Sequence, residues 1–319
     1  MKIAFDIMGG DFAPSEAIKG IHLFFDENHD SNVHLLLIGT PETIAQCAAE
    51  LEPYAGRYTF IEAPQVITMS EHPTKALKEK QQSSIAIGFG LLHAKKADAF
   101  ISAGNTGAMM VGAMYTVKNV PGVLRPTIAS PIPRIDGKHN LLLDVGINAD
   151  CKPENMVQFA LLGSMYMQHV YGVEKPKVGL LNIGEEEGKG NLLAQATYPL
   201  LKEHKDINFI GNIEGRDVFI QKADVIVCEG FVGNVALKMA ESIYDLLITE
   251  RGMKDEFLET FNHEIYGGTP ILGINDTVII GHGVAHALAF KNMIDVARRN
   301  VEAQLSARFI SYFSPTEVA

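Results

Sequence analysis

Short apolar runs alternate with longer amphipathic segments along almost the whole chain. Leu141-Leu142-Leu143 and Val225-Ile226-Val227 are continuously apolar, which is typical of strands covered on both faces of a sheet. The pattern predicts strands near residues 2–8, 33–39, 58–63, 98–103, 127–132, 140–145, 177–183, 207–213, 224–229 and 277–282. It predicts helices near residues 14–28, 41–51, 74–96, 105–117, 153–171, 190–204, 232–250 and 285–313. This alternation predicts an α/β fold, with a mostly parallel sheet and helices on both of its sides.

The predicted elements follow one another without a break in composition. No Pro-, Ser- or Gly-rich linker, low-complexity tract or short repeat divides the 319 residues, which are enough for a large core. We therefore expect a single α/β catalytic domain over residues 1–319, with two closely joined lobes as the alternative. A projecting helical segment is expected over about residues 240–275.

Composition narrows the class of protein. Hydrophobic residues make up 47% of the chain, and the net charge is −11, spread without long runs. An acidic chain of this kind argues against nucleic acid as a partner, because binding to phosphate backbones needs a basic face. The three cysteines, Cys47, Cys151 and Cys228, are far apart, so neither a disulfide framework nor a CxxC site is indicated.

The N-terminal residues run directly into a predicted strand, Lys2–Asp6, without the apolar core of a signal peptide. No apolar run reaches the roughly 18–20 residues that are needed to span a bilayer. We therefore expect a cytoplasmic protein whose membrane contact, at the inner face, is peripheral.

Polar residues on glycine-rich turns follow seven of the predicted strands. The turns are Asp6–Asp11, Gly104–Gly107, Asp144–Asn148, Asn182–Glu185, Gly211–Glu214, Glu229–Asn234 and Gly281–Gly283. In open α/β sheets, ligands bind outside the carboxyl ends of the strands. Any one of these glycines could simply permit a tight turn, but seven turns that carry amides and carboxylates predict a shared ligand-binding cleft.

The turn Gly104-Asn105-Thr106-Gly107 lies between a predicted buried strand and a helix of small apolar residues. Its backbone N–H groups and the positive end of the helix would suit an anion. The turn lacks the Lys-Ser/Thr of a P-loop and the G-x-G-x-x-G spacing of a dinucleotide site. We expect Gly104, Asn105, Thr106 and Gly107 to bind phosphate, and helix capping by Asn105 or Thr106 is compatible with that role.

Several longer motifs follow one another along the chain. They are Asp6–Pro14, Ser102–Ala108, Arg125-Pro126, Leu143–Asp150, Leu180–Glu186, Lys189–Asn191, Phe209–Arg216, Val227–Lys238, Tyr266–Gly273 and Ile279–Gly283. In these motifs the chain resembles the PlsX-type phosphate acyltransferases, the acyl-carrier-protein:phosphate enzymes of bacterial phospholipid synthesis. It departs from that family at Ile147, often alanine, at Glu229, often aspartate, and at Val284-Ala285, often two serines.

The resemblance implies a three-layer α/β/α fold related to phosphotransacetylases and to the isocitrate-dehydrogenase-like group. It also implies a homodimer that transfers a long-chain fatty acyl group from the acyl carrier protein thioester to inorganic phosphate. The acyl phosphate would feed a membrane glycerol-3-phosphate acyltransferase. No cofactor is implied.

A thioester is already activated, and phosphate is a competent oxygen nucleophile. Such a transfer needs an anion cradle, donors for the developing oxyanion, and a proton or other stabilisation for the departing thiolate. The chain has no G-x-S-x-G elbow and no cysteine in a glycine-rich turn beside a histidine. We therefore expect direct attack by phosphate in a ternary complex, with ping-pong chemistry as the alternative.

Five residues are the catalytic candidates. Lys189 lies between glycines and could neutralise phosphate or the oxyanion, although it could equally be a solvated lysine on a turn. Asn212, Asn234 and Lys238 could contribute amide and ammonium groups, and Lys238 follows Asn234 by one helical turn. His282 could protonate the thiolate, with a hydrogen-bonded structural histidine as the alternative.

The loop of Asp6, Gly9, Gly10 and Asp11 is also expected at the active site. A carboxylate beside phosphate is repulsive unless it is protonated or bridged, so a role in stabilising the turn is the alternative. The spacing of His282 and His286 superficially suggests a metal pair, but no third ligand accompanies them at a usual spacing. We expect no metal.

An acidic carrier protein would need a local basic patch on this acidic chain. Lys291, Arg298 and Arg299 on the last predicted helix are the candidates, with ordinary surface charges as the alternative.

Apolar residues recur at helical spacing within 253–265 and predict an amphipathic segment. They are Met253, Phe257, Leu258, Phe261 and Ile265. Phe257, Leu258 and Phe261 would form a patch that packs in the core or dimer, or contacts lipid as the alternative.

Three other readings of the sequence remain open. A small-acyl phosphotransacetylase that uses coenzyme A would perform the same chemistry. An oxidoreductase would need a metal-binding carboxylate cluster and nicotinamide contacts, neither of which is evident. A non-catalytic scaffold that binds carrier protein would leave the polar turns unexplained.

Overall fold

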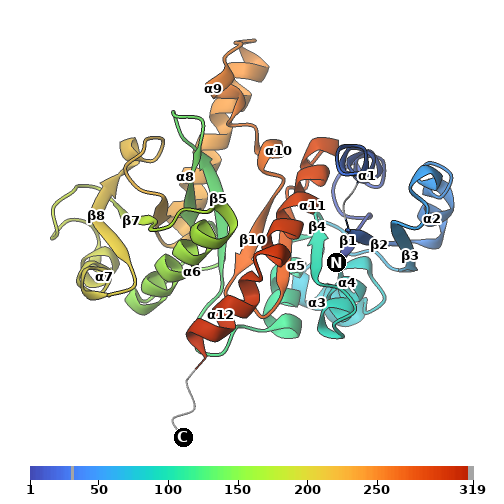
Figure 1. The fold of residues 1–319 in the computed structure, drawn as a ribbon, viewed down its shortest axis with the longest axis horizontal. Coiled ribbons are helices and arrows are strands. Elements are labelled where there is room, and N and C mark those ends of the chain that lie inside the picture. Colours follow the sequence, from blue (N-terminus) through green and yellow to red (C-terminus); the bar gives the residue numbers. More distant parts are fainter. Residues whose placement is uncertain (30–31, 315–319) are drawn as a thin grey trace, which may run out of the picture. The chain divides into compact units, whose positions relative to one another are not determined.

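The computed structural model describes residues 1–29 and 32–314 (Figure 1). The chain divides into two compact units. Unit 1 combines Met1–Asn119 with Glu264–Arg308, and unit 2 combines Val120–His263 with the chain from Phe309 onward. Unit 1 is therefore assembled from two segments that are far apart in the sequence.

Six strands form the sheet of unit 1. In spatial order they are β3 (Tyr58–Glu62), β2 (His34–Gly39), β1 (Lys2–Asp6), β4 (Ala99–Ser102), β11 (Thr277–Gly281) and β10 (Gly268–Leu272). All pairs are parallel except β10 with β11. The carboxyl ends of β1, β4 and β11 consequently lie at the same edge of the sheet.

Helices cover both faces of this sheet. The helices of unit 1 are α1 (Ser15–Glu27), α2 (Pro41–Cys47), α3 (Pro73–Glu79), α4 (Ser84–His93), α5 (Thr106–Gly112), α10 (His263–Tyr266) and α11 (Ala287–Glu302). A 3₁₀ turn lies at Glu52–Tyr54 and a π-helical turn, η2, at Ala113–Val117. The last helix, α12 (Leu305–Phe313), begins in unit 1 and ends in unit 2. Alternate strand residues such as Phe5 and Ile101 pack in one core with α1 and α11. Phe100, which points the other way, contacts Phe89 of α4.

Five strands form the sheet of unit 2, in the order β5 (Thr127–Pro133), β6 (His139–Leu143), β9 (Val225–Val227), β7 (Lys177–Asn182) and β8 (Asn208–Glu214). Only the β5–β6 pair is antiparallel. The other elements are α6 (Pro153–Tyr171), α7 (Leu192–Glu203), a 3₁₀ turn at Gly215–Asp217, α8 (Gly230–Tyr244), a π-helical turn at Asp245–Glu250, and α9 (Glu256–Glu259). The α/β fold with mostly parallel strands is confirmed.

The predicted strands are all present, but three helical predictions need correction. The helix expected over 74–96 is two helices, because the side chain of Ser83 accepts a hydrogen bond from the Ala86 N–H and starts α4. The helix expected over 285–313 is interrupted by Gln304, whose φ is +52°. The projecting segment expected over 240–275 is helical only in part, since Gly268–Leu272 is strand β10.

The amphipathic segment over 253–265 is not one continuous helix. Only α9 and the short α10 are helical there. Phe261 is buried against Phe219 and Phe257, with ring centroids 5.3 Å apart in each pair, whereas Leu258 is half-buried. Of the apolar patch expected at Phe257, Leu258 and Phe261, only Phe261 is fully packed, and the other two side chains are partly accessible.

Within residues 1–29 and 32–314, no helix is both long and apolar enough to cross a membrane.

Candidate functional site

In unit 1, the loops after β1 and β4 are joined through the buried carboxylate of Asp6. It accepts a hydrogen bond from the Ser102 hydroxyl at 2.7 Å and another from the Met8 N–H at 3.0 Å. The Ser102 oxygen in turn accepts the Gly104 N–H at 2.9 Å. Burial raises the pKa of Asp6, while these donors oppose the shift. Asp6 therefore fixes the turn that begins at Gly104 rather than facing a ligand.

The loop after β1 lies directly against its two neighbours. A Cβ on Gly9 would stand 2.6 Å from the backbone nitrogen of Gly104, so only glycine allows this approach. The N–H of Asp11 donates to the Gly283 carbonyl at 2.7 Å. Unit 1 thus brings together three of the predicted strand-end turns, with the side chain of Asp11 exposed.

Asn105 is committed to structure. Its side-chain oxygen accepts the N–H of Ala108 at 3.0 Å and caps α5. Its amide nitrogen lies within 3.0 to 3.2 Å of the carbonyls of Thr68, Met69 and Glu71. The side-chain amide N–H groups of Asn105 therefore point at the carbonyls of the 68–71 loop, while its oxygen serves the cap, and phosphate binding by Asn105 stays a prediction.

Thr106 and Gly107 are the accessible part of the same turn. Thr106 is exposed and Gly107 half-buried. They are the first two residues of α5, where backbone N–H groups have no partner within the helix. A phosphate site at this turn remains a prediction, and Thr106 and Gly107 are the residues of the turn that a phosphate could reach.

His282 and His286 follow β11, and both are exposed. His286 stacks on Phe12, with centroids 4.6 Å apart, and its Nδ1 lies 3.6 Å from a carboxylate oxygen of Glu16. The structure therefore gives His286 partners other than a metal pair with His282.

In unit 2, a second buried carboxylate organises the loop after β6. Asp144 accepts the hydroxyl of Thr127 at 3.1 Å and the N–H of Ile128 at 3.0 Å. Its other oxygen accepts the backbone N–H of Asn148 at 2.6 Å and the side-chain amide of Asn148 at 3.0 Å. Burial raises the pKa of Asp144 against these donors. The sequence motif contained Asp144 but gave no sign that it would hold the loop.

The N-terminus of α8 packs onto that loop. A Cβ on Gly233 would lie 1.9 Å from the carbonyl oxygen of Asp144, so the two backbones touch. The side chain of Glu229 caps α8 by accepting the N–H groups of Phe231 and Val232 at 2.6 and 3.0 Å. Asn234 donates to the Val145 carbonyl at 3.1 Å. Asn234 is therefore a positioning residue for this loop.

Lys238 lies one turn beyond Asn234 on α8, and its side chain is exposed. The two residues thus lie on one helix at the expected spacing of one turn, and their joint role at a site stays a prediction. Lys238 presents an ammonium group to solvent, while the Asn234 amide is directed at backbone.

Two asparagines hold the loop between β7 and α7. Asn182 donates to the Lys189 carbonyl at 3.1 Å, and Asn212 donates to the Glu186 carbonyl at 2.9 Å. Asn212 is buried, whereas Lys189 is exposed near the end of the loop that leads into α7. The amide of Asn212 thus positions the loop, and the lysine is the group that can reach a ligand.

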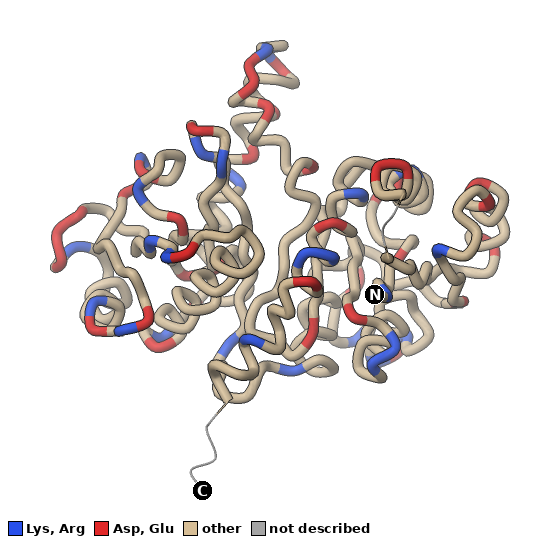
Figure 2. The backbone as a smooth tube through the Cα atoms, viewed as in Figure 1, with Lys and Arg blue, Asp and Glu red and all other residues tan. Residues whose placement is uncertain are grey.

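Basic and acidic positions alternate along α11, the helix that carries the expected docking residues (Figure 2). Lys291 lies 2.6 Å from Glu27 and 3.3 Å from Asp295. Arg298 lies 3.0 Å from Asp295, and Arg299 donates to the Asp295 backbone carbonyl at 3.4 Å. These carboxylates offset positive charge on α11, and docking of a carrier protein at the three basic residues stays a prediction.

Among the described residues, one cluster of three carboxylates has metal-like geometry: Glu185, Glu214 and Asp217. The ammonium of Lys222 lies 2.5 Å from Glu185 and 2.6 Å from Asp217. A cationic side chain therefore already occupies the position that a metal ion would take.

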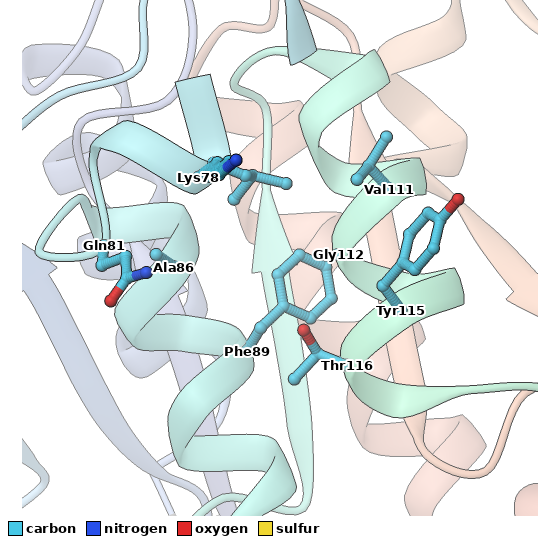
Figure 3. Close-up of a pocket in the computed structure, with 9 residues that line it drawn as sticks. Lys78, Gln81, Ala86, Phe89, Val111, Gly112, Tyr115 and Thr116 are labelled. Carbon is cyan, nitrogen blue, oxygen red and sulfur yellow. The ribbon is translucent and has the colours of Figure 1, made fainter. Parts of the chain in front are cut away.

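Each unit contains a cavity. In unit 1, a cavity of about 310 Å³ lies between α3, α4 and the α5–η2 segment, where Phe89 reaches toward Gly112 and Thr116 (Figure 3). None of its lining residues belongs to the strand-end turns. In unit 2, a cavity of about 430 Å³ lies at the carboxyl ends of β7 and β9, beside the loop that carries Lys189.

Comparison with solved structures supports the fold. A phosphotransacetylase from Staphylococcus aureus aligns with a TM-score of 0.63 and 16% identity, covering 96% of this chain and 94% of that one. A branched-chain phosphotransacylase from Enterococcus faecalis gives the same TM-score at 13% identity, covering 94% and 99%. The predicted phosphotransacetylase-like fold is confirmed.

Comparison of sequences is more specific. The model of the family described as fatty acid synthesis protein matches residues 1–308. A phosphate acyltransferase from Dictyoglomus turgidum is 42% identical, covering 97% of both chains. One from Halothermothrix orenii is 44% identical, covering 94% of this chain and 95% of its own. The resemblance to PlsX-type enzymes is confirmed, and the chain belongs to this phosphate acyltransferase family.

Proposed function

We propose that the protein transfers a long-chain fatty acyl group from the thioester of acyl carrier protein to inorganic phosphate. The product is an acyl phosphate for phospholipid synthesis. The observation that carries this proposal is the 42–44% identity to phosphate acyltransferases over almost the whole chain. The exposed donors on the strand-end loops of each unit are consistent with anionic substrates.

In the proposed reaction, a phosphate oxygen attacks the thioester carbonyl carbon in a ternary complex. The C–O bond forms, the C–S bond breaks, and the thiolate leaves with a proton. Binding both substrates in one orientation supplies much of the acceleration, because the thioester needs no further activation. No covalent enzyme intermediate is required.

We assign some of the candidate residues to substrate contact and others to positioning, and their exposure and hydrogen bonds support this division. Thr106 and Gly107 offer N–H groups, and Lys189 and Lys238 offer ammonium groups, for phosphate and the developing oxyanion. His282 is the candidate acid toward the thiolate. Asp6, Asn105, Asn212 and Asn234 act through the loops they hold.

We further propose that the enzyme is a cytoplasmic homodimer without a cofactor. It would contact the inner face of the membrane, or a membrane glycerol-3-phosphate acyltransferase, peripherally. The half-buried and exposed apolar side chains near α9 support such a contact surface. The carrier protein would dock on α11 through Lys291, Arg298 and Arg299, which would have to exchange some of their contacts with Glu27 and Asp295 for contacts with the carrier.

The test is thiol release from palmitoyl-acyl carrier protein, with and without phosphate, and with hydroxylamine to trap acyl phosphate. Acetyl-coenzyme A as the donor tests the small-acyl alternative. Phosphate-dependent release from the carrier protein alone supports the proposal. Carrier binding with no release at saturating phosphate would leave only the scaffold alternative.

Lys189→Ala is expected to lower kcat/KM for phosphate about 10²-fold, as loss of one charged oxyanion or phosphate donor does in other enzymes. The matched control is Lys175→Ala, an exposed lysine just before the opposite end of β7. Steady-state thiol release measures both variants. Equal activity of the two would remove Lys189 from the site.

A further inference from the structure

The 430 Å³ cavity of unit 2 is built mainly from apolar side chains. Its walls include Met156 of α6, Leu181 at the end of β7, Leu193 and Ala194 of α7, and Val232 of α8. Cys228 also lines the cavity. Burial raises the pKa of its thiol well above the ordinary value, so the sulfur stays neutral and behaves as a small hydrophobe.

The polar side chains at this cavity are engaged elsewhere. Asn182 donates to the Lys189 carbonyl, and Asn191 accepts the Ala194 N–H as the cap of α7. Glu229 accepts two N–H groups as the cap of α8. An anion bound here would lie near the Glu229 carboxylate and would have few available hydrogen-bond donors, whereas a hydrocarbon would contact mainly apolar side chains.

Large apolar side chains that line the cavity, or that are next in sequence to its lining, are exposed to solvent. Ile183, which lines the cavity, is 80% exposed. Leu192 and Phe231, each next in sequence to a lining residue, are 86% and 67% exposed. Exposed apolar groups gathered at a concave site mark a surface that an apolar ligand covers.

The cavity is continuous with the loop that carries Lys189. Gly190 and Asn191, the two residues after this lysine, form part of its lining. A ligand in the cavity therefore lies beside a loop of the proposed catalytic site. This placement favours a part of the substrate over an unrelated molecule.

We propose that this cavity binds the hydrocarbon chain of the acyl group and so sets the preference for chain length. The inference rests on the proposed function, because it assigns one part of the acyl donor to a subsite. The proposed occupant is the hydrocarbon chain of the acyl group, and not the arm that links the acyl group to the carrier protein.

Val232→Trp tests the proposal by narrowing the cavity from an exposed position. Val232 is 40% exposed on α8, so a larger side chain there does not disturb the core. Val235→Trp is the matched control, because Val235 is 45% exposed on the same helix and does not line the cavity. Thermal melting of both variants checks that they are folded.

The readout is the ratio of kcat/KM for 16-carbon and 6-carbon acyl-carrier-protein donors. Val232→Trp is expected to lower this ratio about tenfold or more, and Val235→Trp to leave it unchanged, since pocket contacts discriminate by chain length on this scale. An equal loss with both donors would mean that the common arm occupies the cavity. That result, or an unchanged ratio, overturns the proposal.

Direct binding separates failure of this inference from failure of the proposed function. The chain has no tryptophan, so Ile183→Trp places a single reporter at the cavity rim. Its emission is expected to shift to the blue when palmitate is added, and that of Ile220→Trp, outside the cavity, is not. A shift without any acyl transfer supports the cavity and refutes the activity. Acyl transfer without a shift refutes the cavity alone.

Discussion

In each unit a buried aspartate holds the loop that follows a strand, but the groups that donate hydrogen bonds to the aspartate differ between the units. Each has a buried aspartate at the end of a strand, Asp6 after β1 and Asp144 after β6, and burial raises the pKa of both. Asp6 is held partly by the hydroxyl of Ser102, whose oxygen in turn accepts a hydrogen bond from the Gly104 N–H. Asp144 is held chiefly by backbone and side-chain amides. A hydroxyl can rotate toward another acceptor, but a buried backbone N–H cannot, so the loop of unit 2 depends more on its carboxylate.

The largest expected effect tests that difference directly. Asp144→Ala should lower the free energy of unfolding by about 3 kcal/mol or more, because it leaves the buried N–H groups of Ile128 and Asn148 without their acceptor. Asp6→Ala should cost about half as much, because it leaves one backbone N–H, that of Met8, without its acceptor, whereas the Ser102 hydroxyl can turn elsewhere. Urea unfolding followed by circular dichroism measures both. The comparison breaks if Asp6→Ala is the more damaging substitution.

Two capping asparagines sharpen the comparison at a smaller scale. Asn105 of unit 1 and Asn191 of unit 2 both accept a hydrogen bond at a helix N-terminus. Asn191→Ala should cost about 1 kcal/mol, the usual value for a lost cap. Asn105→Ala should cost about 2–3 kcal/mol, because it also abandons the carbonyls of the 68–71 loop. Similar unfolding midpoints for the two variants would show that this loop contributes little.

The smallest effect concerns pH. Since burial raises the pKa of Asp6 above its unfolded value, its favourable contribution is complete below about pH 4 and is lost as the pH rises through the folded pKa. Asp6→Asn keeps an acceptor for Ser102 but does not titrate. The stability of wild type relative to this variant should therefore fall as the pH rises above about 4, as urea midpoints would show. A difference that stays constant or grows would contradict the sign of the shift.

Much of the fold could be predicted from sequence, because buried parallel strands are continuous apolar runs. β10 was missed because Gly268 and Pro270 belong to a class of residues more typical of turns, and only pairing with β11 makes the segment a strand. The break between α3 and α4 depends on a serine cap, without a glycine or proline to mark it.

The site was less predictable, because its residues were judged by type and not by partner. The turn after β4 was identified, but the amide of Asn105 is used by carbonyls more than thirty residues away in sequence. Likewise, Lys291 resembles a docking residue until Glu27 of α1 is placed beside it. Chemistry can be inferred from a motif, whereas availability for a ligand depends on long-range contacts.

The division of unit 1 between two distant segments has a consequence for biosynthesis. β4 pairs with β11, so one of its edges has no native partner until residues 277–281 have been synthesised. By then the whole of Val120–His263 has already been synthesised. During much of translation, the apolar strand β4 therefore has one edge without its native partner. An unpaired strand edge favours aggregation, so chaperones would protect the nascent chain in this period.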